Sequence, residues 1–226
     1  MQERHKLVAL CFAASFIGYI DRVNISVAAL AMQEQYGWSE TIKGFVLSAF
    51  FIGYLLFMVP SGWLANRFGG KRVLLVAVLW WSIFTLITPL AAGMSFAALI
   101  AARIAMGLGE AAMFPAAYNL YSRWVPVGER SRAVALMLAG IPLGTLFALM
   151  TTGVMVKHYG WPSVFYAFGL VGLVWCVVWL KLAYDRPADH PNLTPAERTL
   201  LRAVAPDQHP KEPVPWGKLL RSSAVW

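Results

Sequence analysis

Four charged residues lie inside long apolar stretches of this sequence. Asp21 and Arg22 are adjacent in "FIGYIDRVNISVAAL", and Arg103 and Glu110 occur together in "AARIAMGLGEAAMFPAA". A carboxylate can take up and release a proton, whereas the planar guanidinium of arginine binds anionic groups through several N–H donors. These residue types therefore indicate a site that handles an anion, protons, or both.

The stretches that carry these charges have the composition of membrane spans. Hydrophobic residues make up 59% of the chain and charged residues only 13%, against about half and about a quarter in soluble proteins. A transmembrane helix needs about 20 mostly apolar residues. We therefore predict an all-α membrane protein whose six transmembrane helices lie at about 7–31, 44–65, 73–92, 95–120, 131–156 and 161–184.

The depth of the charges within these spans favours function over packing. An ionised residue near the bilayer centre costs about 2.5–3.5 kcal/mol, and such residues usually mark a substrate or proton path. Asp21 and Arg22 are about 100° apart around a helix, so they cannot both face one partner well. Arg103 and Glu110 are seven residues apart, which places them on one helix face. We expect a polar cavity shared by the first and fourth spans. The alternative is that Arg103 pairs with Asp21 and Glu110 only to hold the helices together.

The distribution of positive charge predicts the orientation in the membrane. Of the 19 Lys and Arg residues, fifteen flank the spans on one side, two lie on the other side, and two lie within spans. The positive-inside rule then places both termini in the cytoplasm. The net charge of +8 does not indicate a nucleic-acid partner, because the basic residues flank spans and form no aromatic–basic module.

Several other chemistries are excluded by context. Cys11 and Cys176 lie in apolar runs, so no disulfide framework is expected. The segment "GLGEAA" matches a dinucleotide fingerprint but lies within a predicted span, where a strand–turn–helix unit cannot form. No set of residues resembles a nucleophile with its base, a metal cluster or a phosphate loop. We predict no cofactor, no metal and no enzymatic activity.

The chain divides into two parts by composition. Residues 1–184 form the predicted bundle, and residues 185–226 form a polar, proline-rich cytoplasmic linker. Within the linker, Thr194 can cap a helix, and Glu197 completes the pattern of a capping box. We expect a short surface helix over about 195–204. Four glycines are expected to permit close contact between helices: Gly107, Gly109, Gly140 and Gly144.

The loop "GWLANRFGGKR" resembles the loop motif of the major facilitator superfamily. Asn66 stands where the family has an acid. Gly62 is expected to let helices approach, and the basic residues are expected to meet helix carbonyls or acids on neighbouring segments. Further matches, "DRVNISVA", "SRWVPVGERSRA", "GWPSVFYAFG" and "HPNLTPAER", resemble the anion:cation symporter branch, which includes sugar-acid permeases, sialin and vesicular glutamate transporters. The loop residues that match or nearly match the motif are Gly62, Leu64, Arg67, Gly69, Lys71 and Arg72.

The resemblance implies a fold of two six-helix bundles, each made of two inverted three-helix repeats. This chain would supply the amino-terminal bundle, the linker and, in "WGKLLRSSAVW", the approach to helix 7. The second bundle, an expected partner, is missing from the chain. It would therefore be a fragment, a truncated gene product or a half that needs a partner. A lone bundle should expose the face that meets its partner, including the first and fourth spans.

The resemblance also implies a function, proton-coupled symport of a small organic anion such as a sugar acid, across the lipid bilayer of the plasma membrane. Arg22 would grip the substrate carboxylate. Arg103 would pair with the acids or with the substrate. Tyr19 and Tyr54 would touch the substrate, and Asp21 and Glu110 would be the proton sites.

Two other functions are compatible with the sequence. The chain could be a truncated, non-transporting six-helix protein that binds a partner bundle, or a relative of drug/proton antiporters. The segment "AGIPLGTLFA" argues against the antiporter, because it lacks the fuller glycine–proline pattern of that group.

The predicted topology is testable by labelling. A cysteine introduced near Ser39 or Lys157 should react with an impermeant reagent added from outside the cell, because both residues lie in the loops that carry little positive charge. Labelling at Gly70 or Asp189 instead would contradict the prediction.

Overall fold

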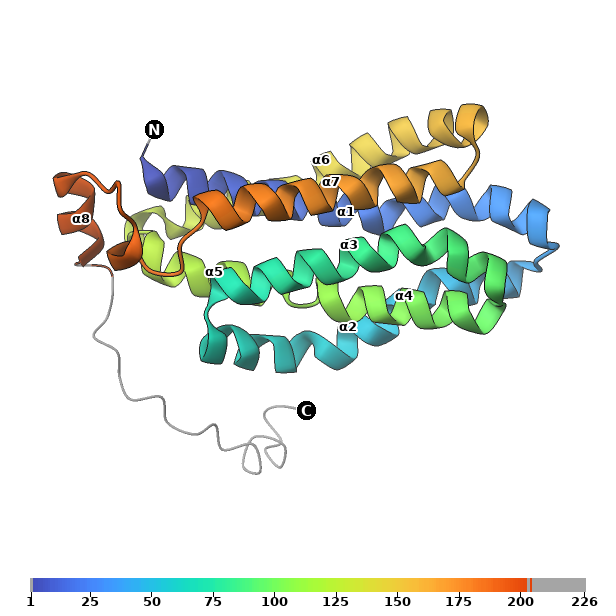
Figure 1. The fold of residues 1–226 in the computed structure, drawn as a ribbon, viewed down its shortest axis with the longest axis horizontal. Helices are drawn as coiled ribbons and strands as arrows, with labels where there is room; N and C mark the ends of the chain where they lie inside the picture. The colour runs from blue at the N-terminus through green and yellow to red at the C-terminus, as the bar shows by residue number, and fades with distance from the viewer. Residues whose placement is uncertain (1, 203, 205–226) are drawn as a thin grey trace, which may run out of the picture.

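The computed structural model describes residues 2–202 and 204, and the regular elements within them are all helices (Figure 1). The elements are α1 (Glu3–Tyr36), α2 (Glu40–Phe68), α3 (Gly70–Met94), α4 (Phe96–Glu110), α5 (Met113–Trp124), α6 (Val127–Tyr159), α7 (Pro162–Leu182), the 3-10 helix η1 (Pro187–Asp189) and α8 (Pro195–Arg202).

Among the described residues, six helical segments are long and apolar enough to cross a membrane, which confirms the predicted number of spans. The first, second, third and fifth extend a few residues beyond the predicted span at both ends, and the fourth does so only at its C-terminal end, at Trp124. The sixth is shorter than predicted and ends at Leu182. The ends are set by local chemistry: the hydroxyls of Ser39 and Ser95 accept hydrogen bonds from the first turns of α2 and α4. Gly37 ends α1 with a φ of 65°, a left-handed conformation that glycine adopts without strain.

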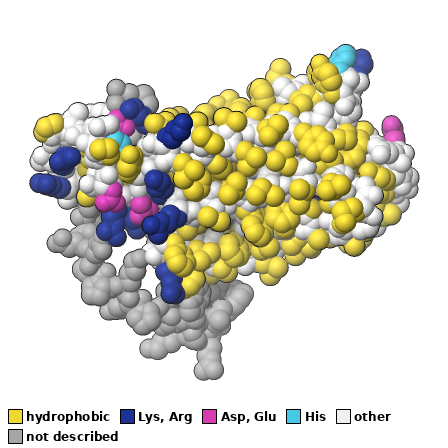
Figure 2. Space-filling view, viewed as in Figure 1, with side chains coloured by type: hydrophobic (Ala, Val, Ile, Leu, Met, Phe, Trp, Pro, Cys, Tyr) yellow, Lys and Arg dark blue, Asp and Glu magenta, His cyan; other side chains and the backbone are white. Residues whose placement is uncertain are grey.

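The helices form two layers that run side by side (Figure 1). In one layer α1 packs along α6 and also contacts α7, and in the other α2 and α3 pack along α4. The layers are joined chiefly where α3 packs on α7. The N-terminus, α5 and α8 lie at the same end of the bundle, where Lys and Arg side chains gather, whereas hydrophobic side chains cover most of the visible remainder (Figures 1 and 2). This end is called the basic end below.

Glycines allow the helix backbones to touch. A Cβ atom on Gly53 would lie 1.9 Å from the carbonyl oxygen of Ile104, and one on Gly107 would lie 2.0 Å from that of Phe50. These reciprocal contacts hold α2 against α4. Gly109 has the same role against Trp80 of α3.

Two further glycines lie in the interface between α6 and α1. A Cβ atom on Gly144 would lie 2.4 Å from the carbonyl oxygen of Phe16, and one on Gly140 would lie 2.9 Å from that of Phe12. Close contact is thereby confirmed for Gly107, Gly109, Gly140 and Gly144. The prediction for Gly62 is wrong, because a Cβ there would meet nothing within 4 Å.

The fourth span is broken directly after Glu110. Pro115 has no N–H, so the carbonyl of Ala111, four residues earlier, cannot receive its usual helical hydrogen bond. The hydroxyl of Ser61 donates to that carbonyl instead, at 3.2 Å. The sequence predicted one continuous helix here. The break places the carboxylate of Glu110 at the end of α4, in the middle of the fourth span.

The linker helix α8 is docked on the bundle. Thr194 caps it as predicted, accepting from the backbone N–H of Glu197 at 3.2 Å. The other half of the expected capping box is absent, because the Glu197 carboxylate accepts instead from the backbone N–H groups of Glu3 and Arg4 at the start of α1. Glu197 and Leu201 are buried, whereas the other residues of α8 are exposed, so the predicted surface helix is present and contacts the bundle through one face. The helix ends at Arg202, and the segment "WGKLLRSSAVW" lies outside the described residues.

The least buried spans are α2 and α6, in whose apolar windows only 22% and 28% of residues are buried. The spans that contain α1 and α4 are 56% and 50% buried. About half of each of these two windows is therefore not buried, and the expectation that the first and fourth spans expose a face to a partner bundle stays a prediction. Lipid or protein must cover the long sides of α2 and α6.

The glycine contact between α2 and α4 predicts the effect of one methyl group. Gly107→Ala should destabilise the bundle by about 1–3 kcal/mol, because the obstructing atom is backbone and cannot move aside. The midpoint of unfolding in mixed micelles, followed by tryptophan emission, measures this.

Gly62→Ala is the matched control for Gly107→Ala, because open space surrounds Gly62. It should be neutral or stabilising by up to about 1 kcal/mol, since alanine favours a helix over glycine. Equal destabilisation by the two substitutions would contradict the role assigned to Gly107.

Candidate functional site

A buried ion pair joins α1 to α4 in the interior of the bundle. The Nε of Arg22 donates to Oε1 of Glu110 at 2.9 Å, and Nη2 lies 2.6 Å from the same oxygen. The Glu110 side chain is fully buried, whereas that of Arg22 is 16% exposed. One part of the guanidinium therefore still faces open space, and the second carboxylate oxygen, Oε2, has no hydrogen-bond partner in the described part of the chain.

Aromatic rings surround the Arg22 guanidinium. Its central carbon lies 4.7 Å from the ring centre of Tyr19, 4.7 Å from that of Phe50 and 4.8 Å from that of Tyr54. Rings at this distance attract the cation through their quadrupoles and keep water away from it. Tyr19 and Tyr54 are partly exposed and Phe50 is buried. The structure thus brings together four of the predicted site residues, Arg22, Glu110, Tyr19 and Tyr54.

Arg103 is buried near the same cluster but has a different partner. Its guanidinium carbon lies 5.4 Å from the centre of the Phe50 ring, and Nη1 lies 3.2 Å from the sulfur of Met106. The ion pairs found among the described residues do not include Arg103. Glu110, which the sequence offered as a partner for Arg103, pairs with Arg22 instead.

Asp21 is fully buried, and neither of its carboxylate oxygens has a hydrogen-bond partner among residues 2–202 and 204. The indole N–H of Trp81 on α3 lies nearby without the geometry of a hydrogen bond. Asn24, one turn further along α1, is also buried with an unpaired side chain. A carboxylate without hydrogen bonds in an apolar interior is strongly disfavoured in its charged form.

The site contains residues that sequence reasoning did not select. Phe50 is apolar, and its contact with the guanidinium groups of both arginines becomes visible only in the structure. Asn24, by contrast, was visible in the sequence as a polar residue one turn after Asp21 that could hydrogen-bond a polar ligand. Trp81 and Ser82, both with unpaired buried polar atoms, have the composition of ordinary core residues and offered no such signal.

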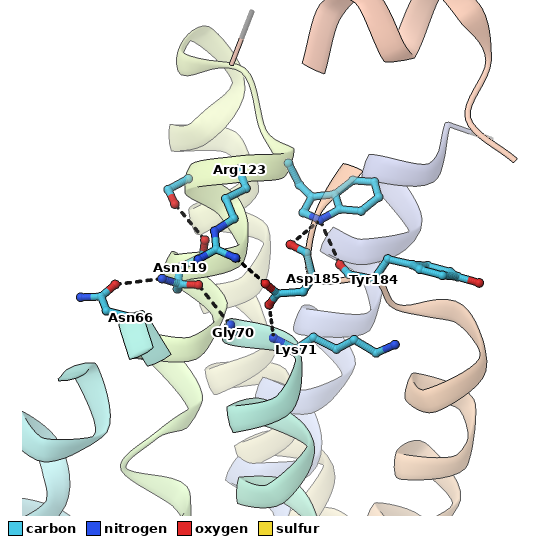
Figure 3. Close-up of polar contacts among 9 residues, drawn as sticks. Asn66, Gly70, Lys71, Asn119, Arg123, Tyr184 and Asp185 are labelled. Carbon is cyan, nitrogen blue, oxygen red and sulfur yellow. Dashed lines mark hydrogen bonds and ion pairs between the residues drawn. The ribbon is translucent and has the colours of Figure 1, made fainter. Parts of the chain in front are cut away.

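The glycine-rich loop at the basic end is held by polar contacts (Figure 3). Gly69 has a φ of 89°, and a Cβ there would lie 2.5 Å from a carboxylate oxygen of Asp185, so both conformation and space require glycine. The N–H of Gly70 donates to the side-chain oxygen of Asn119 at 3.1 Å. The amide of Asn119 in turn donates to the side-chain oxygen of Asn66 at 2.9 Å.

Asp185 supplies the acid at this end of the molecule. Its carboxylate accepts a hydrogen bond from the backbone N–H of Lys71 at 3.0 Å and pairs with Arg123 (Figure 3). The indole of Trp124 donates to the carbonyl of Tyr184 at 3.0 Å. Asp185 therefore ties the segment after α7 to the start of α3 and to the end of α5, and Asn66 joins the network as a neutral hydrogen-bonding residue.

The remaining loop residues lie apart from this network. Lys71 extends its ammonium over the ring of Tyr184, at 5.0 Å from the centre. Arg67 lies near the rings of Trp63 and Phe68 and makes further interactions. Arg72 is exposed and lines an apolar pocket. The ion pair with Asp185 is made by Arg123 of α5, a residue outside this loop that the sequence did not select.

In the described part of the chain, no group of three or more His, Cys, Asp or Glu side chains is arranged to hold a metal ion.

Comparison with known proteins identifies the family. An all-helical bundle with charged residues buried in its first and fourth spans is the architecture of one half of a membrane transporter fold. The sequence profile of the Major Facilitator Superfamily matches residues 11–226. The chain belongs to this family.

Curated relatives carry the names of anion transporters. The chain is 42% identical to Sodium-dependent phosphate transport protein 1, chloroplastic, of Arabidopsis thaliana, over 99% of this chain and 44% of that protein. It is 41% identical to the Ascorbate transporter, chloroplastic, of the same plant, over 99% of this chain and 41% of that protein. It is 32% identical to human Sialin, over 99% of this chain and 51% of that protein. The chain spans about half the length of these relatives.

Solved structures confirm the fold. A bacterial homologue of the human lysosomal transporter Spinster, in an inward-facing and unoccupied conformation, matches with a TM-score of 0.73 at 23% identity, over 86% of this chain and 47% of that one. A D-xylose–proton symporter matches with a TM-score of 0.71 at 16% identity, over 80% and 48%. The bundle described here therefore has the fold of half of such a transporter.

The contacts of Asp185 predict the effect of neutralising it. Asp185→Asn should destabilise the basic end by about 1–3 kcal/mol, because the Lys71 N–H and Arg123 lose a charged acceptor. Faster hydrogen exchange of the Lys71 amide would report this opening. Asp189→Asn is the matched control, since Asp189 is exposed and makes none of these contacts. An unchanged exchange rate in Asp185→Asn would contradict the anchoring role.

Proposed function

We propose that this chain forms the first six-helix bundle of a secondary transporter that moves a small organic anion together with protons. The observation that carries the proposal is the Arg22–Glu110 pair, in which the carboxylate is fully buried and the guanidinium is not. Arg22 thus has an internal counterion when no substrate is present, and it retains an accessible part to which an anion can bind bidentately.

The names of the relatives support the anionic substrate. They mention phosphate, ascorbate and sialin, and phosphate and ascorbate are both small oxygen-rich anions. Tyr19 and Tyr54 border the accessible part of Arg22 and can hydrogen-bond a polar ligand through their hydroxyls. Arg103 supplies a second buried positive charge close to Phe50. We propose these four residues as the contribution of this bundle to substrate binding.

Coupling to protons follows from competition for Arg22. A charge left unpaired in a dry interior is strongly unfavourable, so Arg22 needs an anionic partner in every state. When a substrate anion takes that role, Glu110 loses its partner and binds a proton more readily. Anion and proton then bind as one coupled event with reciprocal affinities. Asp21, buried and without hydrogen bonds, is the second proton site.

The loop at the basic end is proposed as a gate. In the family fold, access alternates as one bundle rocks against the other around a fixed site. Gly69, Lys71 and Asn66 belong to a loop whose backbone is fixed by Asn119 and Asp185. Such a loop is a rigid edge against which a second bundle can close. With the positive-inside rule, we place this edge and both termini in the cytoplasm and the protein in the plasma membrane.

The division of roles is testable in a completed transporter, made by fusing the second bundle of a close relative to this chain. Arg22→Ala should lose binding of gluconate, ascorbate and inorganic phosphate at every pH, because Arg103, the other cation of the proposed site, is fully buried and cannot replace it. Glu110→Gln and Asp21→Asn should still bind an anion but lose the pH dependence of binding and uphill uptake. Binding is measured by calorimetry and uptake in proteoliposomes.

Two controls make the result specific. Arg132→Gln removes an exposed positive charge on α6 and should leave binding and uptake unchanged. Arg22→Lys keeps the charge but not the planar fork and should bind weakly. Normal anion binding by Arg22→Ala, or uphill uptake by both acid variants, would show that the proposed division is wrong.

A further inference from the structure

An apolar groove of about 600 Å³ lies between α2 and α3, with α4 as its floor. Gly109 on α4 and Ala112, in the break between α4 and α5, contribute to the floor, whereas Glu110, between them in sequence, points to Arg22. The groove is therefore on a different side of α4 from the proposed anion site. Its lining residues are Phe57, Leu64, Phe68, Arg72, Val73, Val76, Ala77, Trp80, Leu108, Gly109 and Ala112.

The groove has one charged residue, at one end. Arg72 lies in the first turn of α3, at the basic end, and its side chain is exposed. The hydrogen bonds and ion pairs found among the described residues do not include the Arg72 side chain. The other lining residues are apolar or, in the case of Trp80, already satisfied, because the indole N–H donates to the carbonyl of Ala105 at 2.7 Å. An occupant must therefore be apolar along its length and anionic at one end.

The length of the groove matches one leaflet of a bilayer. Arg72 and Trp80 are eight residues apart on α3, which corresponds to about 12 Å along the helix axis. The hydrocarbon of one leaflet is about 15 Å deep. A transmembrane helix of a second bundle would have to cross the whole hydrocarbon core and has a diameter of about 10–12 Å, whereas this groove ends at Trp80, within the bilayer. An acyl chain fits this shape better than a helix does.

We propose that the groove binds an anionic glycerophospholipid from the leaflet at the basic end, with its phosphate on Arg72 and one acyl chain along α2 and α3. Basic side chains between transmembrane helices are known positions for anionic headgroups. The position of the lipid beside Gly107 and Gly109 also places it against the contacts that hold α2 and α3 to α4. The proposal does not depend on the function proposed above.

Trp80 provides a reporter inside the groove. The whole 226-residue chain is reconstituted in vesicles that contain phosphatidylglycerol or phosphatidylcholine brominated in the middle of the acyl chain, since bromine quenches tryptophan emission on contact. The difference between the parent chain and Trp80→Phe isolates the Trp80 signal from the other nine tryptophans. Half-maximal quenching of this signal should need about five-fold less brominated phosphatidylglycerol than phosphatidylcholine, the factor expected for one cation and an anionic lipid.

Three variants separate the binding site from general attraction to a charged membrane. Arg72→Gln should abolish the five-fold preference, and Arg132→Gln, which removes an exposed arginine outside the groove, should keep it. Val76→Phe should lower quenching by both lipids, because the ring occupies the groove while Arg72 remains. Size-exclusion profiles and far-UV circular dichroism verify that the variants are folded.

Three results would overturn the proposal. Equal quenching by the two lipids in the parent chain would show that Arg72 selects no headgroup. Equal loss of preference in Arg72→Gln and Arg132→Gln would show attraction to the surface alone. Protection of Trp80 from both lipids would show that protein, such as a second copy of the chain, covers the groove.

Discussion

The interior of this bundle depends on the pairing of opposite charges that are buried inside it. An unpaired charge on Arg22 or on Glu110 would be strongly unfavourable inside the membrane, whereas together the two side chains form one compact ion pair. The pair fixes α1 relative to α4 in the middle of the membrane, where the two helices otherwise have few contacts. The three rings around Arg22 then cover most of the guanidinium and leave one part of it exposed. A substrate anion that separates these partners would therefore loosen a connection between helices as well as occupy a site.

The backbone contacts at the glycines explain how such a polar interior can be tightly enclosed. Gly53 and Gly107 bring α2 and α4 close enough for backbone to meet backbone, which leaves Phe50 in position to cover both arginines. In a membrane, where lipid is as apolar as leucine, this close packing is the main attraction between helices. Gly107, which was expected to serve packing, thus also determines the surroundings of the charges.

The sequence predicted the spans, the family and the residues of the mid-membrane site, because long apolar runs and charges within them are local signals. It did not predict the partners, since which carboxylate reaches Arg22 depends on the relative rotation of α1 and α4. It also missed the break after Glu110, although Pro115 was visible, because the compensating Ser61 is on another helix. At the basic end the family motif has an acid in the loop, where this chain has Asn66. The acid that contacts the loop is Asp185, more than a hundred residues later, which no local pattern could indicate.

The docking of α8 changes the reach of the chain that follows it. Glu197 holds the first turn of α1, and Leu201 is buried with it, so the 20 residues from 183 to 202 belong mechanically to the first bundle. As a free tether they would span about 70 Å when extended. Fixed in place, they add nothing to that distance. A shorter tether raises the effective concentration of the part of the protein attached to its far end. The loss of the Glu197 carboxylate alone would therefore release these residues from the bundle and lengthen the free tether.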